Sequence, residues 1–260
     1  MLTTDYAPGA PNWLDLGCPD TAAAAAFYGA LFGWDFQSAG PEAGGYGFWQ
    51  KDGKTVAALG PLTEEGASSA WTVYFHTPDA DATAKAVEQG GGTVRVEPFD
   101  VMDAGRMALL TDPGGAKFAV WQPAAVTGLE AVNDIDALCW VELHATDPAT
   151  AHSFYRSLFG WRSEQMEVPG MTYAVLSTAN GDQQSASFGG IAPLQDDAQQ
   201  PRWLPYFAVA DTDDIVARTQ ENSGSVAMPA MDVPDIGRIA WLADPFGTYF
   251  AIISPTVNAS

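Results

Sequence analysis

Two ionisable side chains near the middle of the chain have the spacing of an acid/base pair. Glu142 and His144 stand two residues apart in a short apolar stretch. Side chains alternate along a β-strand, so both would lie on one face, together with Trp140. A carboxylate beside an imidazole can hold and transfer a proton near neutral pH, which makes this pair the candidate catalytic residues. The structural alternative is that a buried acid here binds a backbone or ring N–H group.

The same pattern occurs earlier in the chain without the imidazole. Trp13 and Asp15 correspond to Trp140 and Glu142, but Gly17 stands where His144 would be. Any proton-transfer chemistry is therefore expected in the second copy of the pattern. Asp15 has the same structural alternative as Glu142, because buried acids usually have hydrogen-bond partners.

The pattern recurs because the chain is a tandem repeat. The run Leu31-Phe32-Gly33-Trp34 returns as Leu158-Phe159-Gly160-Trp161, and residues 71–123 match residues 203–255 without a gap. Two extended matches in the same order indicate a duplication. We therefore expect two domains, the first at residues 1–126 and the second at residues 127–260.

Each module carries the signals of two β-α-β-β-β units. Helices are expected where a capping aspartate precedes a helix-forming run, at residues 20–33, 79–89, 147–159 and 211–221. Strands are expected in the first module at residues 13–17, 47–50, 55–59, 71–77, 94–98, 106–111 and 117–121. The predicted fold class is α+β, with four such units in the whole chain.

An Asp-Pro-x-Gly turn precedes the last strand of each module, beginning at Asp112 and Asp244. Together with the W-x-[DE]-L start and the Leu-Phe-Gly-Trp helix end, this pattern resembles the vicinal oxygen chelate superfamily. That superfamily includes glyoxalase I, extradiol dioxygenases and bleomycin-resistance proteins. The resemblance covers nearly the whole chain in both copies. It implies paired β-α-β-β-β units whose curved mixed sheets enclose an open cavity.

Metal-using members of that superfamily carry ligands at three places in a module. In this chain the corresponding positions hold no metal-binding side chain: Trp13, Val73 and Ala119 in the first copy, and Trp140, Pro205 and Ala251 in the second. Indole is only a donor, and Val, Pro and Ala offer no side-chain lone pair. A His/carboxylate site needs three or four convergent ligands. We therefore expect no metal, no cofactor and no classical metal-dependent glyoxalase or dioxygenase activity.

If these positions face the cavity, side chains two and four residues along the same strands face it too. The resulting lining is aromatic with a few polar groups, which suits a planar apolar ligand. The predicted ligand-binding residues are Trp13, Asp15, Phe75, Trp121, Trp140, Phe207 and Tyr249. The alternative for Trp13 and Trp140 is that they fill the core where a metal would otherwise sit.

The composition excludes several classes of partner. The chain has 32 acidic and 11 basic residues and a net charge of −21, which argues against nucleic acid and anionic membranes. The sequence contains no run of about 18 apolar residues, so no membrane span is predicted. The first residues do not resemble a secretory signal. Two cysteines make no disulfide framework, so we expect a cytoplasmic protein.

Three kinds of function fit these observations. The first, which we predict, is metal-independent binding of a planar hydrophobic small molecule, such as an antibiotic or secondary metabolite, in an aromatic cleft. The second is a metal-free enzyme of the hydroxylase-accessory, isomerase or lyase type that uses Glu142 and His144 on an aromatic metabolite. The third is an interaction or structural protein with an occluded cavity. The sequence leaves open whether the chain acts as a monomer or a homodimer.

Overall fold

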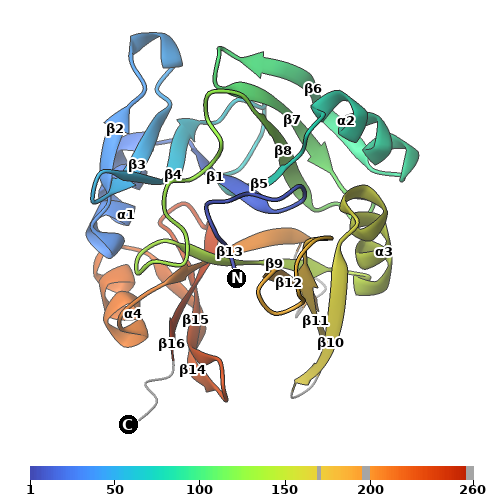
Figure 1. Cartoon of the computed structure of the whole chain (residues 1–260). Coiled ribbons are helices and arrows are strands. Elements are labelled where there is room, and N and C mark those ends of the chain that lie inside the picture. Colours follow the sequence, from blue (N-terminus) through green and yellow to red (C-terminus); the bar gives the residue numbers. More distant parts are fainter. Residues whose placement is uncertain (169–170, 195–199, 256–260) are drawn as a thin grey trace. The chain divides into compact units, whose positions relative to one another are not determined.

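The computed structural model describes residues 1–168, 171–194 and 200–255 (Figure 1). Its α-helices are α1 (Thr21–Phe32), α2 (Ala80–Gln89), α3 (Pro148–Phe159) and α4 (Thr212–Glu221), with a short 3₁₀ helix at Pro41–Ala43. All four begin after an aspartate whose side chain accepts a bond from a backbone N–H of the first turn. The predicted helices are confirmed. No helix in the described ranges is long and apolar enough to cross a membrane.

The strands form two mixed sheets of eight strands (Figure 1). The order in the first is β2 (Asp35–Ser38), β3 (Gly47–Lys51), β4 (Lys54–Pro61), β1 (Pro11–Cys18), β5 (Ala70–His76), β8 (Lys117–Pro123), β7 (Gly105–Thr111) and β6 (Thr93–Val101). The order in the second is β10 (Arg162–Val168), β11 (Met171–Ser177), β12 (Ser187–Pro193), β9 (Leu138–Ala145), β13 (Arg202–Ala208), β16 (Tyr249–Pro255), β15 (Gly237–Ala243) and β14 (Ser225–Val233). The α+β class and the repeated β-α-β-β-β order are as predicted.

Strand β2 was not predicted from the sequence. Its four residues are half-buried or exposed, so they show no apolar alternation. The strand exists because it pairs antiparallel with β3, from Asp35 opposite Gln50 to Ser38 opposite Gly47. Pairing with β3, and not the local sequence pattern, makes these residues a strand.

The chain folds into two compact units, and each draws on both repeats. Unit 1 contains residues 1–13, 72–128 and 140–204. Unit 2 contains residues 14–71, 129–139 and 205–260. Each unit therefore combines the first half of one repeat with the second half of the other. The repeat boundary read from the sequence is a different boundary from that of the compact units.

A cluster of aromatic rings forms the core of each unit. In unit 1, Phe75 is fully buried and packs against a set of rings from both repeats: Phe118, Tyr155, Phe159, Trp161, Phe188 and Trp203. In unit 2, Phe207 has the same role among Phe32, Trp34, Trp71 and Phe250. Burial of such large side chains is the main stabilising contribution here.

The aspartate of each Asp-Pro-x-Gly turn binds the helix of the other repeat. In unit 1 the Tyr155 hydroxyl donates to Asp112 Oδ2 at 3.1 Å and accepts from Trp203 Nε1 at 3.0 Å. In unit 2 the Tyr28 hydroxyl donates to Asp244 Oδ2 at 3.2 Å and accepts from Trp71 Nε1 at 3.1 Å. These linked hydrogen bonds satisfy the polar atoms of otherwise apolar cores.

Candidate functional site

Strand β9 brings the predicted acid/base pair into direct contact. Glu142 Oε1 lies 2.7 Å from His144 Nε2, and both residues belong to unit 1. The His144 side chain is fully buried and that of Glu142 is 9% exposed. Which of the two atoms donates in this hydrogen bond depends on the tautomer of His144. The prediction that these two side chains share a face of one strand is confirmed.

Two further residues extend this pair into a chain of hydrogen bonds. The Tyr173 hydroxyl, on β11, donates to Glu142 Oε2 at 2.8 Å. Trp140 Nε1 donates to the same hydroxyl at 2.9 Å. Burial, and then the nearby charge of Glu142, raise the pKa of Tyr173 well above its ordinary value, so the hydroxyl keeps its proton. The carboxylate of Glu142 is thus oriented through both of its oxygens.

Tyr173 was not among the predicted site residues. In the alignment of the two repeats it corresponds to Tyr46, so its recurrence was a signal that the sequence contained. Its position depends on Gly190, which stands opposite Glu142 on β12. A Cβ at Gly190 would overlap the Tyr173 hydroxyl and its ring. Glycine is therefore required here for space, since the Tyr173 side chain approaches the backbone closely.

The first repeat contains a related arrangement with a longer hydrogen bond between tyrosine and carboxylate. The Tyr46 hydroxyl donates to Asp15 Oδ2 at 3.3 Å, near the long limit of a hydrogen bond. Ala58 stands opposite Asp15 on β4, where the second repeat has Gly190. Gly17 replaces the imidazole of His144. The polar chain of the second repeat is therefore not duplicated in full.

Trp13 and Trp121 form a stacked pair in unit 1. Their ring centroids are 6.4 Å apart with an interplanar angle of 21°, and their exposed fractions are 8% and 7%. Trp121 Nε1 donates to the Val126 carbonyl at 2.8 Å. Trp140 is instead half-buried, with its N–H directed to Tyr173. The stacked pair of the first repeat has no counterpart in the second, because Ile253 corresponds to Trp121 there.

The face assigned to strands β5 and β13 needs correction. Tyr74, and not Val73, stands opposite Ala119, and Tyr206, and not Pro205, stands opposite Ala251. Phe75 and Phe207 therefore point to the other face, into the aromatic cores, and core packing accounts for both. Both faces of β5 are rich in apolar residues, so alternation gave no guide to its orientation. Tyr249, the remaining predicted ligand contact, lies in unit 2 and is 37% exposed.

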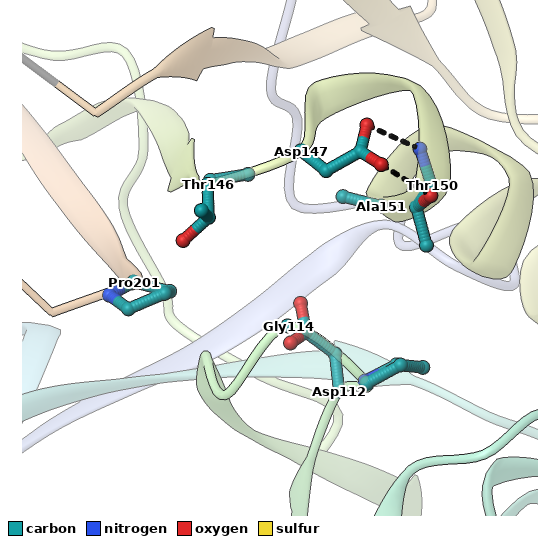
Figure 2. Close-up of a pocket in the computed structure, with 9 residues that line it drawn as sticks. Asp112, Gly114, Thr146, Asp147, Thr150, Ala151 and Pro201 are labelled. Atoms are coloured by element: carbon teal, nitrogen blue, oxygen red, sulfur yellow. Dashed lines mark hydrogen bonds between the residues drawn. The ribbon is translucent and has the colours of Figure 1, made fainter.

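Two of the pockets in the structure are each lined by residues of a single unit. The pocket of unit 1 has a volume of about 160 Å³ and lies next to Asp112, Thr146, Asp147, Thr150 and Pro201. Figure 2 shows Asp112 and Gly114 on one side of it and Asp147 bonded to Thr150 on the other. This volume is below the range of about 300–1,000 Å³ that is usual for ligand pockets. Asp147 caps α3 and Asp112 binds Tyr155, so both carboxylates have structural roles.

The pocket of unit 2 is larger, at about 400 Å³. It lies between the β3–β4 hairpin and residues 131–137, and Lys51 on its wall is paired with Asp136 at 2.9 Å. Its lining includes charged side chains of both signs, which does not suit a planar apolar ligand. Neither pocket is lined by a predicted site residue.

Comparison with known proteins identifies the family. The family model of the Glyoxalase/Bleomycin resistance protein/Dioxygenase superfamily matches residues 10–120 and 137–252, once in each repeat. The chain belongs to this superfamily. It is 39% identical to the anthracycline biosynthesis protein DauV of Streptomyces sp. (strain C5), over 96% of this chain and 94% of that protein. It is 37% identical to the putative glyoxylase CFP32 of Mycobacterium tuberculosis, over 97% of each chain.

Solved structures share the superfamily fold at low sequence identity. The Mn(II)-bound glyoxalase from Novosphingobium aromaticivorans matches with a TM-score of 0.65 at 17% identity, covering 95% of this chain and 82% of that one. The 2,2',3-trihydroxybiphenyl 1,2-dioxygenase from Sphingomonas wittichii matches with a TM-score of 0.65 at 13% identity, covering 95% and 91%. These likenesses establish the fold of the chain and leave its chemistry to its own residues.

The superfamily includes metal-bound members, but the residues at the expected ligand positions do not fit a metal. Val73, Ala119 and Ala251 are fully buried and have no donor atom in their side chains. Tyr206, one of the two tyrosines that share a face with these alanines, accepts a hydrogen bond at its Oη from Trp241 Nε1 at 3.0 Å. Within the described ranges, His, Cys, Asp and Glu side chains form no group of three that could hold an ion.

Proposed function

We propose that this protein binds a planar hydrophobic small molecule without using a metal. The observation that carries the proposal is the set of residues at the six ligand positions. Tryptophan occupies the first-strand position in both repeats, and Ala119 and Ala251 occupy the last-strand position. The superfamily scaffold is thus kept while aromatic and aliphatic groups replace the donors. Aromatic rings supply stacking and edge contacts to a flat ligand.

The relatives narrow the class of ligand that we propose. Two of them, from Streptomyces, are named as anthracycline biosynthesis proteins and are each 39% identical to this chain. We propose a polycyclic aromatic secondary metabolite as the ligand. A net charge of −21 supports a small-molecule partner over nucleic acid or an anionic membrane. Both cysteines are free, which is consistent with the cytoplasmic location that we propose.

Isothermal titration with planar anthraquinones tests the binding proposal. We expect saturable binding that is unchanged after the protein is dialysed against EDTA. A linear alcohol of similar hydrophobicity serves as the control for non-specific burial. Absence of binding to every planar compound would contradict the proposal. A stoichiometric divalent ion that survives dialysis, seen by mass spectrometry of the purified protein, would overturn its metal-free part.

The contact between Glu142 and His144 supports a second candidate, a metal-free enzyme. In that function Glu142 takes a proton from an acidic C–H or O–H of the aromatic metabolite, and His144 stabilises the carboxylate through its Nε2 proton at 2.7 Å. The proton then returns to a different atom, as in an isomerisation. The geometry supplies an oriented base, which is the minimum requirement for such chemistry.

Deuterium exchange separates the two candidates. The probe is α-tetralone, a small aromatic ketone with exchangeable hydrogens beside its carbonyl. An enzyme of this type accelerates exchange in D2O, followed by NMR, and Glu142→Gln abolishes the acceleration while binding persists. If wild-type protein binds the probe but exchange stays at the uncatalysed rate, the enzyme function is ruled out and only the binding function remains.

A further inference from the structure

The larger pocket, in unit 2, has the dimensions of a binding site for a small organic molecule. Its volume of about 400 Å³ lies within the range of about 300–1,000 Å³ that is usual for ligand pockets. One wall comes from the β3–β4 hairpin and the other from the segment that joins the two repeats. Both walls belong to unit 2, so the pocket is formed within one compact unit.

Charged side chains of both signs line this pocket together with buried apolar ones. The apolar part consists of Val56, Ala131 and Ala137, all of them buried. The charged part consists of Lys51, Lys54, Asp52, Asp134 and Asp136. The chain has only four lysines, and two of them line this pocket although the net charge is −21. Positive charge, which is scarce in this chain, is therefore concentrated here beside negative charge.

Hydrogen bonds hold the two walls of the pocket together. Lys51 Nζ lies 2.9 Å from Asp136 Oδ2 and donates to the Phe32 carbonyl at 3.0 Å. Glu130 Oε2 accepts from the Thr55 N–H at 2.7 Å, and the Glu130 N–H donates to the Thr55 carbonyl at 2.8 Å. A wall that is already ordered loses little conformational entropy when a ligand binds, which favours affinity.

The equivalent place in unit 1 lacks the carboxylate of Asp136. Trp34 Nε1 donates to the Asp136 carbonyl at 2.7 Å, and Trp161 Nε1 donates in the same way to the Gly9 carbonyl at 2.9 Å. Gly9 is thus the counterpart of Asp136, and the two φ values, 81° and 63°, are both left-handed. Glycine adopts this conformation without steric cost. The fold shared by the two units therefore does not require a carboxylate at this position.

We propose that this pocket binds a small zwitterionic molecule with an aliphatic skeleton, such as a free amino acid. Within the described residues, Lys54 and Asp134 take part in no ion pair, so each can face a charge on the ligand. Lys54 binds the ligand carboxylate, Asp134 binds the ligand ammonium, and the apolar part of the lining contacts the carbon chain. A wall with charges of both signs is complementary to a molecule with both. This site is additional to the binding function proposed above and does not depend on it.

Calorimetry with three six-carbon probes tests the proposal. Norleucine carries both charges, hexanoate only the negative one and hexylammonium only the positive one. We expect one equivalent of norleucine per chain and at least about tenfold weaker binding of each other probe, because each leaves one charged group of the wall without a partner. Salt at about 0.15 M screens the general attraction of the chain for cations. Absence of saturable norleucine binding, or binding of a singly charged probe as tight as that of norleucine, would overturn the proposal.

Charge-removing variants assign the two ends of the ligand. Lys54→Gln should weaken norleucine binding about tenfold and leave the weaker binding of hexylammonium unchanged. Asp134→Asn should weaken norleucine binding to a similar degree and leave that of hexanoate unchanged. Lys85→Gln and Asp103→Asn are the matched controls, because they remove the same charges from exposed positions outside the pocket. Equal losses in the variants and their controls, or no loss in either variant, would contradict the site.

Discussion

At the scale of single residues, Asp112 and Asp244 combine a structural role with an electrostatic cost. Asp112 Oδ1 accepts from the Ala116 N–H at 2.8 Å and its Oδ2 accepts from Tyr155 at 3.1 Å. Desolvation nevertheless dominates and raises the pKa of both carboxyl groups. A group whose pKa is raised on folding contributes most stability at low pH. That contribution is lost as the pH rises through the folded-state pKa.

Asp112→Asn tests this pH dependence. Asparagine does not titrate, so the free energy of unfolding of wild type relative to the variant should fall as the pH rises above about 4, the unfolded pKa, and through the raised folded-state pKa. Urea unfolding at a series of pH values measures it. A difference that stays constant or grows over that interval would contradict the assignment. Asp20→Asn, at an exposed helix cap, is the control.

At the scale of elements, the helix ends were easy to predict and the strand faces were not. The Leu-Phe-Gly-Trp runs end α1 and α3 at Gly33 and Gly160, whose φ values of 66° and 70° lie in the left-handed region. Such a cap depends only on residues next to each other in the sequence, so it can be predicted. The face of β5 depends on which neighbours pack on each side, since most of its residues are buried. Tyr173 escaped prediction for a related reason, because the space for its hydroxyl comes from Gly190 on another strand.

Substitution of Gly160 measures what that helix end contributes. Gly160→Ala should destabilise the protein by about 1–2 kcal/mol, because a Cβ is disfavoured at this positive φ. The steric surroundings are permissive, with Ala179 Cβ 3.5 Å from the added atom, so the cost is that of the backbone. Gly160→Asn should cost less, since asparagine tolerates this conformation. Equal losses in both variants, measured by urea unfolding, would contradict this account.

At the scale of the whole molecule, repeats and compact units divide the chain differently. The family model follows the repeats, with matches at residues 10–120 and 137–252. Contacts follow the units, which combine β5–β8 with β9–β12, and β1–β4 with β13–β16, apart from a few terminal residues. Sequence comparison detects ancestry and therefore finds the repeats. It contains no signal for which half of one repeat packs on which half of the other.

Hydrogen exchange of a single variant distinguishes the two divisions. Tyr155→Phe removes the bond to Asp112 and the acceptor of Trp203, a loss of about 1–3 kcal/mol for buried polar groups. If the units open cooperatively, amide protection should fall together in residues 72–128 and 140–204. Tyr28→Phe should do the same in unit 2. If amide protection falls throughout residues 127–260 instead, the second domain predicted from the sequence is the cooperative unit.

The hydrogen bonds from Tyr155 to Asp112 and from Tyr28 to Asp244 each join one repeat to the other. This has a consequence for the loss of a whole repeat. A chain ending after the first repeat would keep Tyr28 and Asp112 but lose the partner of each. Such a chain could recover both hydrogen bonds by associating with another copy of itself. Deleting either repeat from the present protein therefore removes half of both cores, and not one domain of two.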